Sequence, residues 1–286
     1  MNAVKTVEKN DLPLYFLSHT QINMFKRCRM QYCKRYEEKL KIPPPWTMYL
    51  GKVGHKALDF NFEQKIESYT DLDYTDFIEF YYDSFDNNPE RESVNWQEEK
   101  PGQVKDMGYK VLENYYKELK VQKTIQPIAV QKKIEIEFEN KPYALRTYLD
   151  IITDKEEIGD NKISRKTPDK NALANDNQLT TYGLSYMYEY GKKPSALWFD
   201  YLIHLKSGPK YERFPVERTD EHYNQCLEDI GNIAIQIANC RKTGSWDRDT
   251  NGWWCSPKYC GYYLLCRPQD KKVFYEVLEG FKKKGK

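Results

Sequence analysis

The sequence predicts a mixed α/β fold in which a central sheet is flanked by helices. Apolar residues alternate in segments 134–138 and 143–152, which is typical of half-buried strands, and the turn residues 140–142 predict that these strands pair. A third short strand is predicted at 157–163. A wholly apolar strand at 197–203 follows a helical segment, and strands joined through such a crossover helix indicate a mixed sheet with helices packed against it.

Helices are expected before, between and after these strands. Ser18 and Gln21 have the spacing of a capping box, which predicts a helix from Ser18 to about Tyr36. The other predicted elements are helices at 49–66, 75–86 and 102–121, a helix from about 178 to 191, an edge strand at 210–216, a helix from 219 to about 240, and a final basic helix at 269–284.

The chain of 286 residues contains no internal repeat and no linker rich in Pro, Gly or Ser. We therefore expect one domain over 1–286, with a helical N-terminal portion at about 18–121, a core at about 131–217 and a C-terminal helix and cysteine loop at about 219–286.

Composition sets limits on the class of protein. No segment approaches the roughly 18 consecutive apolar residues of a membrane span, so no membrane association is expected. The net charge is only +2, which argues against general electrostatic binding of nucleic acid. The number of cysteines is odd, at seven, and residues 1–9 lack the apolar segment of a signal peptide. Both observations predict a reducing cytoplasm without a disulfide framework.

Two carboxylates and a lysine have a spacing that suits a metal-dependent phosphodiesterase. Asp150 ends one alternating strand, and Asp160 and Lys162 lie two residues apart on the next, so that both side chains project from one face. If the strands pair, Asp150 and Asp160 converge on a hard cation while Lys162 points to the same place. The alternative is that this Asp-x-Lys triplet lies on an ordinary solvated surface.

His55 lies in a helix-like segment upstream, and Gln178 and Tyr182 are four residues apart and share a helix face downstream. Each signal is weak alone, because a lone histidine on a helix is more often an ordinary core or surface residue. In the order His, Asp, Asp-x-Lys, Gln-x-x-x-Tyr, however, the set resembles the PD-(D/E)xK nuclease superfamily, and specifically its RecB-like branch. The helix with Cys28 also resembles that branch, and the resemblance runs from about Ser18 to about Pro268. The chain departs from the pattern in having Leu149 in place of the proline and Asp160 in place of the commoner glutamate.

The resemblance implies a restriction-endonuclease-like sheet and a metal-dependent DNA exonuclease that prefers single-stranded ends. It assigns catalysis to Asp150, Asp160 and Lys162. It assigns the binding of one or two Mg²⁺ or Mn²⁺ ions to His55, Asp150, Asp160 and the backbone carbonyl of Asn161. It assigns DNA binding to Gln178 and Tyr182. The 24 tyrosines would suit a channel in which unpaired bases stack. No phosphate-binding Gly-x₄-Gly-Lys-Ser/Thr loop occurs, so a separate helicase or recombinase is expected as a partner.

The cysteines supply a second pattern. Cys255, Cys260 and Cys266 fall within twelve residues, and three thiolates need a fourth to complete a tetrahedral or cubane site. The resemblance points to Cys28 as the fourth, with Cys33 as the runner-up. It implies a [4Fe–4S] cluster that ties the N-terminal helix to the C-terminal loop. The alternatives are a Zn²⁺ ion or ordinary buried cysteines.

The biological setting stays open between alternatives. The four residues between Cys255 and Cys260 are similar to phage homologues, which favours a phage or bacterial enzyme of DNA recombination, repair or processing. The other settings are a CRISPR-associated nuclease that trims prespacers and a non-catalytic iron–sulfur DNA-binding subunit. The intact set of Asp150, Asp160 and Lys162 argues against the non-catalytic alternative.

Overall fold

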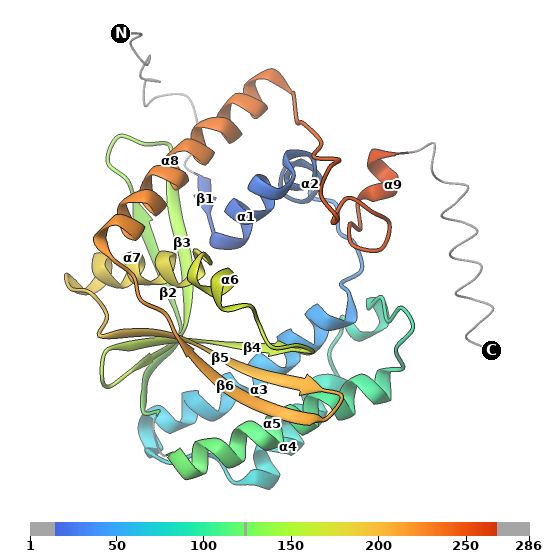
Figure 1. Cartoon of the computed structure of the whole chain (residues 1–286), viewed down its shortest axis with the longest axis vertical. Coiled ribbons are helices and arrows are strands. Elements are labelled where there is room, and N and C mark those ends of the chain that lie inside the picture. Colours follow the sequence, from blue (N-terminus) through green and yellow to red (C-terminus); the bar gives the residue numbers. More distant parts are fainter. Residues whose placement is uncertain (1–14, 123–124, 268–286) are drawn as a thin grey trace.

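The computed structural model describes residues 15–122 and 125–267, and the final basic helix expected at 269–284 lies outside this range. Within it, a six-stranded mixed sheet lies between two helical layers (Figure 1). The mixed α/β fold predicted from the sequence is therefore confirmed. No helix in the described part of the chain is both long and apolar enough to cross a membrane.

The sheet is organised around β3. Its strands are β1 (Tyr15–Leu17), β2 (Pro127–Glu137), β3 (Tyr143–Thr153), β4 (Glu157–Ser164), β5 (Ala196–Leu205) and β6 (Gly208–Pro215). Strand β2 pairs with β3 along most of its length, while the opposite edge of β3 is shared by β1 at its start and β4 near its end. Strands β4 and β5 are parallel, and β6 completes the far edge antiparallel to β5. Sequence analysis missed β1, which is only three residues long.

Strands β3 and β4 separate after a short contact. Their paired positions are Ile151 with Gly159 and Ile152 with Ile158. Asp150 and Asp160 are the next residue on each strand beyond this contact, and β4 continues alongside β5 as far as Ser164. The sheet therefore opens into a fork, with one aspartate on each arm.

Each face of the sheet has its own apolar cluster. On one face lie α3 (Trp46–Ser68), α4 (Tyr74–Asp86) and α5 (Pro101–Gln122), and on the other lie α1 (His19–Arg27), α7 (Gln178–Tyr190) and α8 (Asp220–Thr243). The predicted helices that correspond to α3, α4, α5, α7 and α8 are confirmed, with small shifts at their ends. Sequence analysis missed the short helices α6 (Lys170–Ala174) and α9 (Tyr263–Cys266) and the 3₁₀ turn η2 (Arg91–Ser93).

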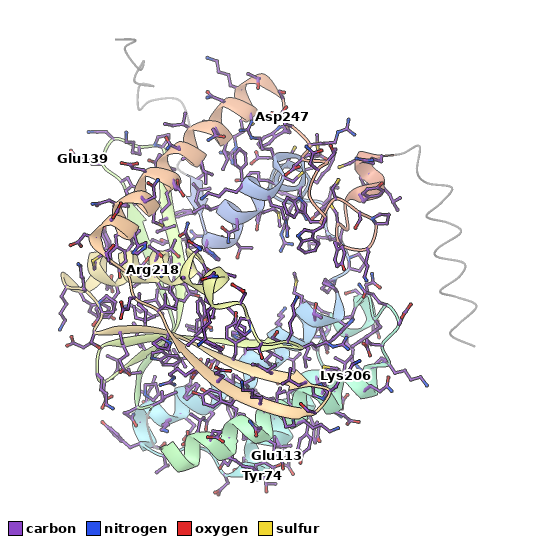
Figure 2. All side chains as sticks on the ribbon, in the orientation of Figure 1. Tyr74, Glu113, Glu139, Lys206, Arg218 and Asp247 are labelled. Atoms are coloured by element: carbon purple, nitrogen blue, oxygen red, sulfur yellow. The ribbon has the colours of Figure 1, made fainter. Side chains whose placement is uncertain are left out.

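The first helix differs from the prediction. Its capping box at Ser18 and Gln21 is present, but the helix stops at Cys28, whose backbone is extended at φ −166° and ψ 112°. A four-residue helix, α2 (Arg29–Tyr32), and a π-helical turn, η1 (Cys33–Glu37), follow. The cause is a tertiary contact: the Met30 amide donates to the carbonyl of Asp247, in the loop after α8 (Figure 2). Local spacing cannot reveal a contact that spans more than 200 residues.

Candidate active site

The predicted catalytic residues meet at the fork between β3 and β4. Lys162 Nζ lies 2.5 Å from Asp160 Oδ2. His55 reaches the same place from α3, and its Nδ1 lies 3.4 Å from Asp150 Oδ2. Both carboxylates are buried, with 6% of Asp150 and 1% of Asp160 exposed. Residues more than 100 positions apart in the sequence thus form one polar cluster inside an apolar sheet.

Two oxygen atoms of this cluster bear on the question of a metal ion. Asp150 Oδ2 and Asp160 Oδ2 are buried, and the groups that face them are His55 Nδ1 and Lys162 Nζ. Two neighbouring carboxylates that are both buried stay unfavourable in their charged forms unless enough positive charge compensates them. Two carboxylates with an imidazole form a mixed N/O donor set that suits Mg²⁺ or Mn²⁺. The residues present therefore fit a divalent cation, although no three His, Cys, Asp or Glu side chains within 15–122 and 125–267 are already grouped around one point.

The two aspartates differ in proton affinity. Burial raises the pKa of Asp160, the Lys162 ammonium opposes this rise and the charge of Asp150 adds to it, so that the resulting pKa is about 7. Burial also acts on Asp150, but the hydrogen bond and charge of His55 outweigh it, so the pKa of Asp150 is lowered. Burial lowers the pKa values of His55 and Lys162, but the carboxylates outweigh it and raise both. Without a cation, the site consequently binds a proton more readily at Asp160 than at Asp150.

Gln178 and Tyr182 contact the catalytic residues directly from the first turns of α7. The Gln178 amide donates to Asp160 Oδ1 at 2.6 Å, and its Oε1 accepts from Lys162 Nζ at 2.8 Å. The Tyr182 hydroxyl donates to Asp160 Oδ1 at 3.3 Å and is buried with its ring. This geometry allows both residues to orient Asp160 and Lys162. That they also contact DNA stays a prediction.

Sequence analysis missed two residues beside Asp150. Asp59 lies one helical turn after His55, and Gln131 Nε2 lies 3.3 Å from the Oδ1 atoms of both Asp59 and Asp150. Burial and the charge of Asp150 raise the pKa of Asp59 to about 6. Gln131 has a φ of 48° within β2, a left-handed conformation that is costly for this residue type. The i,i+4 spacing of His55 and Asp59 could have signalled the first residue, but nothing local signalled the second.

A buried network supports the arm of the fork that carries Asp160. Asp200 on β5 is fully buried and receives two hydrogen bonds from Arg213, each of 2.7 Å. The Tyr115 hydroxyl lies 3.1 Å from Asp200 Oδ2 and 3.3 Å from Asn161 Oδ1. These contacts hold the Asn161 side chain on the face away from Asp160. They fix the segment of β4 whose backbone carbonyl is the predicted metal ligand.

Four cysteines line one small cavity of about 20 Å³, and they are the four that were predicted to act together: Cys28, Cys255, Cys260 and Cys266. None is in a disulfide. The extended backbone at Cys28 ends α1 at this cavity, and the Tyr262 hydroxyl donates to the carbonyl of Leu40, which fastens the loop to the N-terminal region. The runner-up, Cys33, is buried elsewhere, with its thiol near Glu38.

A mixed sheet that forks around two carboxylates and a lysine is the arrangement of a phosphodiester-cleaving nuclease. The chain belongs to the PD-(D/E)XK nuclease superfamily, whose profile matches residues 16–267. No curated protein matches the chain.

One solved structure is similar in fold, and a second one matches only weakly. One is the crystal structure of a putative exonuclease from Eubacterium rectale, with 14% identity, a TM-score of 0.57, and coverage of 84% of this chain and 86% of that one. The other is SSO0001, with 12% identity, coverage of 94% and 89%, and a TM-score of 0.38, which is too low to support an argument.

Proposed function

We propose that the protein is a metal-dependent deoxyribonuclease that removes nucleotides from the ends of single-stranded DNA. The observation that carries this proposal is the convergence of two buried carboxylates, Asp150 and Asp160, with Lys162 at one fork of the sheet. A site built only for stability would rarely bury two neighbouring carboxylates, because the desolvation of each one costs folding free energy.

The residues of the fork have different proposed roles. Asp150, Asp160 and His55 would hold Mg²⁺ or Mn²⁺, together with the carbonyl of Asn161. The bound ion would neutralise the phosphate and lower the pKa of an attacking water. Lys162 lies where its ammonium can stabilise the negative charge that develops on the phosphate in the transition state. The buried carboxylates and the ammonium also exclude bulk water from the reacting group, which strengthens these interactions.

Preference for single strands follows from charge and from aromatic content. A net charge of +2 gives little general attraction to duplex phosphate, so binding depends on local contacts. Stacking on aromatic side chains contributes roughly 1–3 kcal/mol per base and requires unpaired bases. A phage or bacterial setting in DNA recombination or repair, beside a separate helicase or recombinase, is the biological context that we propose.

We also propose that Cys28, Cys255, Cys260 and Cys266 bind a [4Fe–4S] cluster, with Zn²⁺ as the alternative. Support comes from four free thiols around one cavity, contributed by segments more than 200 residues apart. A cavity of about 20 Å³ holds roughly one water molecule, so a four-iron cluster would have to push the cysteine loop outward, whereas a single ion would draw the sulfurs inward. Iron, acid-labile sulfide and zinc analysis of anaerobically purified protein separates the two centres.

The test of the main proposal uses end-labelled single-stranded and blunt duplex DNA with Mg²⁺, Mn²⁺, Ca²⁺ or EDTA. We expect rapid loss of single strands in Mg²⁺ or Mn²⁺ and little loss in Ca²⁺, whose looser coordination positions the water poorly. The Lys162→Ala protein serves as the control for a contaminating nuclease. Cleavage at the wild-type rate by that variant would show that the activity does not belong to this site.

A further inference from the structure

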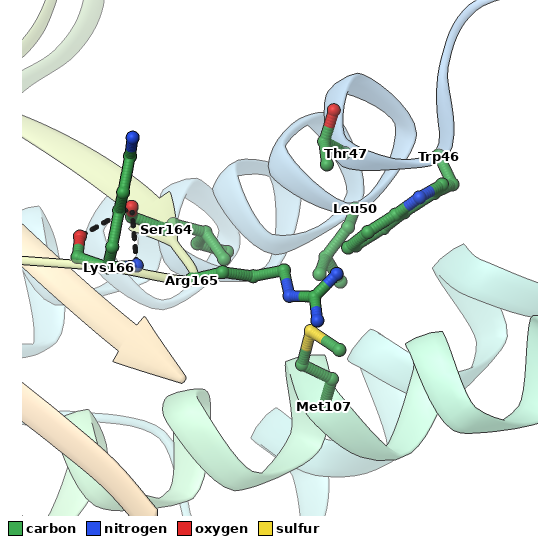
Figure 3. Close-up of a pocket in the computed structure, with 8 residues that line it drawn as sticks. Trp46, Thr47, Leu50, Met107, Ser164, Arg165 and Lys166 are labelled. Carbon is green, nitrogen blue, oxygen red and sulfur yellow. Dashed lines mark hydrogen bonds between the residues drawn. The ribbon is translucent and has the colours of Figure 1, made fainter. Parts of the chain in front are cut away.

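A cavity of about 290 Å³ lies where the first turn of α3, helix α5 and the end of β4 meet (Figure 3). Leu50 and Met107 give it apolar walls, and Trp46, Arg165 and Lys166 line it as well. None of the catalytic residues and none of the four clustered cysteines lines it. Apolar walls combined with an aromatic ring and two cations suit a ligand that is flat on one side and negatively charged on the other.

Two elements connect this cavity to the catalytic fork. Along β4, Arg165 follows Lys162 by three residues, or about 10 Å at 3.3 Å per residue. Along α3, Trp46 precedes His55 by nine residues, or about 14 Å at 1.5 Å per residue. The two elements touch between these points, because a Cβ on Gly54 would lie only 2.1 Å from Ile163 Cδ1. The cavity and the fork therefore lie along the same pair of elements.

Arg165 is held so that its guanidinium can stack. Its Nη1 donates to Glu99 at 2.9 Å, and its central carbon lies 5.4 Å from the centre of the Trp46 ring. About half of the side chain, 54%, is still exposed, so a ligand can reach it. In Figure 3 the guanidinium lies against Met107, whereas the Lys166 side chain points away from it. Lys166 also lines the cavity and would supply a second cation for the phosphate of a base stacked on Arg165.

We propose that this cavity binds one unpaired nucleobase of the DNA strand, one to three nucleotides from the phosphodiester that is cut. This inference rests on the proposed function and extends it to a second contact with the substrate. A volume near 290 Å³ is at the lower end for small-ligand sites, which suits one nucleotide and excludes a base pair. The separation of about 10 Å from Lys162 corresponds to about three stacked nucleotides at 3.4 Å each, and to fewer in an extended strand.

The test uses single-stranded oligonucleotides that carry one abasic residue at successive positions. Cleavage by the wild-type protein should slow by roughly 5- to 150-fold at one position, one to three nucleotides from the cut, because stacking of that base is lost. Arg165→Gln should cut the intact strand more slowly and show no additional loss at that position. Arg146→Gln is the matched control, since Arg146 also stacks on a ring, that of Phe16, and pairs with a glutamate, Glu135.

The outcomes separate this inference from the proposed function. The nucleobase site would be overturned, and the exonuclease left intact, if cleavage were normal and equally fast at every abasic position. The same conclusion would follow if a position-dependent loss persisted in Arg165→Gln or disappeared in Arg146→Gln. Fluorescence anisotropy of the same oligonucleotides in Ca²⁺ measures binding without cleavage. If no DNA were cut in Mg²⁺ or Mn²⁺ but binding still fell at one abasic position only when Arg165 is present, the nucleobase site would stand and the exonuclease would not. If no DNA were cut and binding were also equal at every abasic position, neither the nucleobase site nor the exonuclease would stand.

Discussion

Replacing Asp160 by asparagine should stabilise the metal-free protein at alkaline pH, although it removes a catalytic group. Burial raises the pKa of Asp160 from 3.8 to about 7, so the folded chain holds this proton more tightly than the unfolded chain does. The stability that comes from this group is complete below the unfolded pKa and is lost as the pH rises through about 7. A shift of about 3 pKa units corresponds to about 4 kcal/mol. Asparagine also loses the contact with Lys162, so we expect a net gain of about 1–3 kcal/mol near pH 8.5.

Replacing Asp150 by asparagine should have the opposite effect. The hydrogen bond and charge of His55 lower the pKa of Asp150 in spite of burial. A lowered folded pKa means that ionised Asp150 stabilises the protein above the unfolded pKa, and that this contribution is lost as the pH falls through the folded value. Asp150→Asn should therefore destabilise the protein near pH 8.5. The two substitutions remove the same group from adjacent strands and so control for each other.

The assay is thermal unfolding in EDTA near pH 8.5 and near pH 5.5. Each kcal/mol shifts the Tm by roughly 2–4 °C in a chain of about this size, so Asp160→Asn should raise the Tm by several degrees at the higher pH. Near pH 5.5, midway between the unfolded pKa of 3.8 and the folded pKa of about 7, the gain should be about half as large, because the unfolded chain has already lost a proton that the folded chain still holds. Added Mn²⁺ should stabilise the wild type and neither variant, since the ion binds only the complete site. A lower Tm for Asp160→Asn at both pH values, or shifts of the same sign for both variants, would refute this account of the fork.

Three further outcomes are expected. Lys162→Ala should slow single-turnover cleavage by on the order of 10²–10³-fold while Tm and DNA affinity change little, because Lys162 acts on the transition state; unchanged cleavage would exclude it from the site. Cys28→Ala and Cys266→Ala should both lose bound metal and become protease-sensitive, whereas Cys226→Ala, on the buried face of α8, should keep its metal; metal loss only in Cys33→Ala would transfer the fourth ligand. Linear single-stranded DNA should be degraded much faster than blunt duplex, and closed single-stranded circles should largely survive, because fraying a duplex costs a few kcal/mol; rapid cutting of circles would reveal an endonuclease.

The residues of the proposed catalytic site were predictable where their spacing matches a local period. Asp160 and Lys162 are two apart on a strand, and Gln178 and Tyr182 are four apart on a helix, and the structure brings all four into contact. Gln131 was not predictable, because its role depends on lying opposite Asp150 in the register of β2 and β3 and on an unusual φ of 48°. Register across strands is set by packing of the whole sheet, which no local pattern encodes.

The sequence by itself determined the mixed α/β class, the order of the main strands and helices, and the types of residue available for catalysis and for the cysteine cluster. Periodicity and spacing suffice for these features because they depend on near neighbours in the chain. Only the tertiary structure decided that β3 and β4 part after Ile151 and Gly159, that the helix breaks at Cys28, and that the pKa of Asp160 is raised while that of Asp150 is lowered. Each of these depends on burial or on contacts between distant segments, and two aspartates of identical chemistry acquire different pKa values only once their surroundings differ.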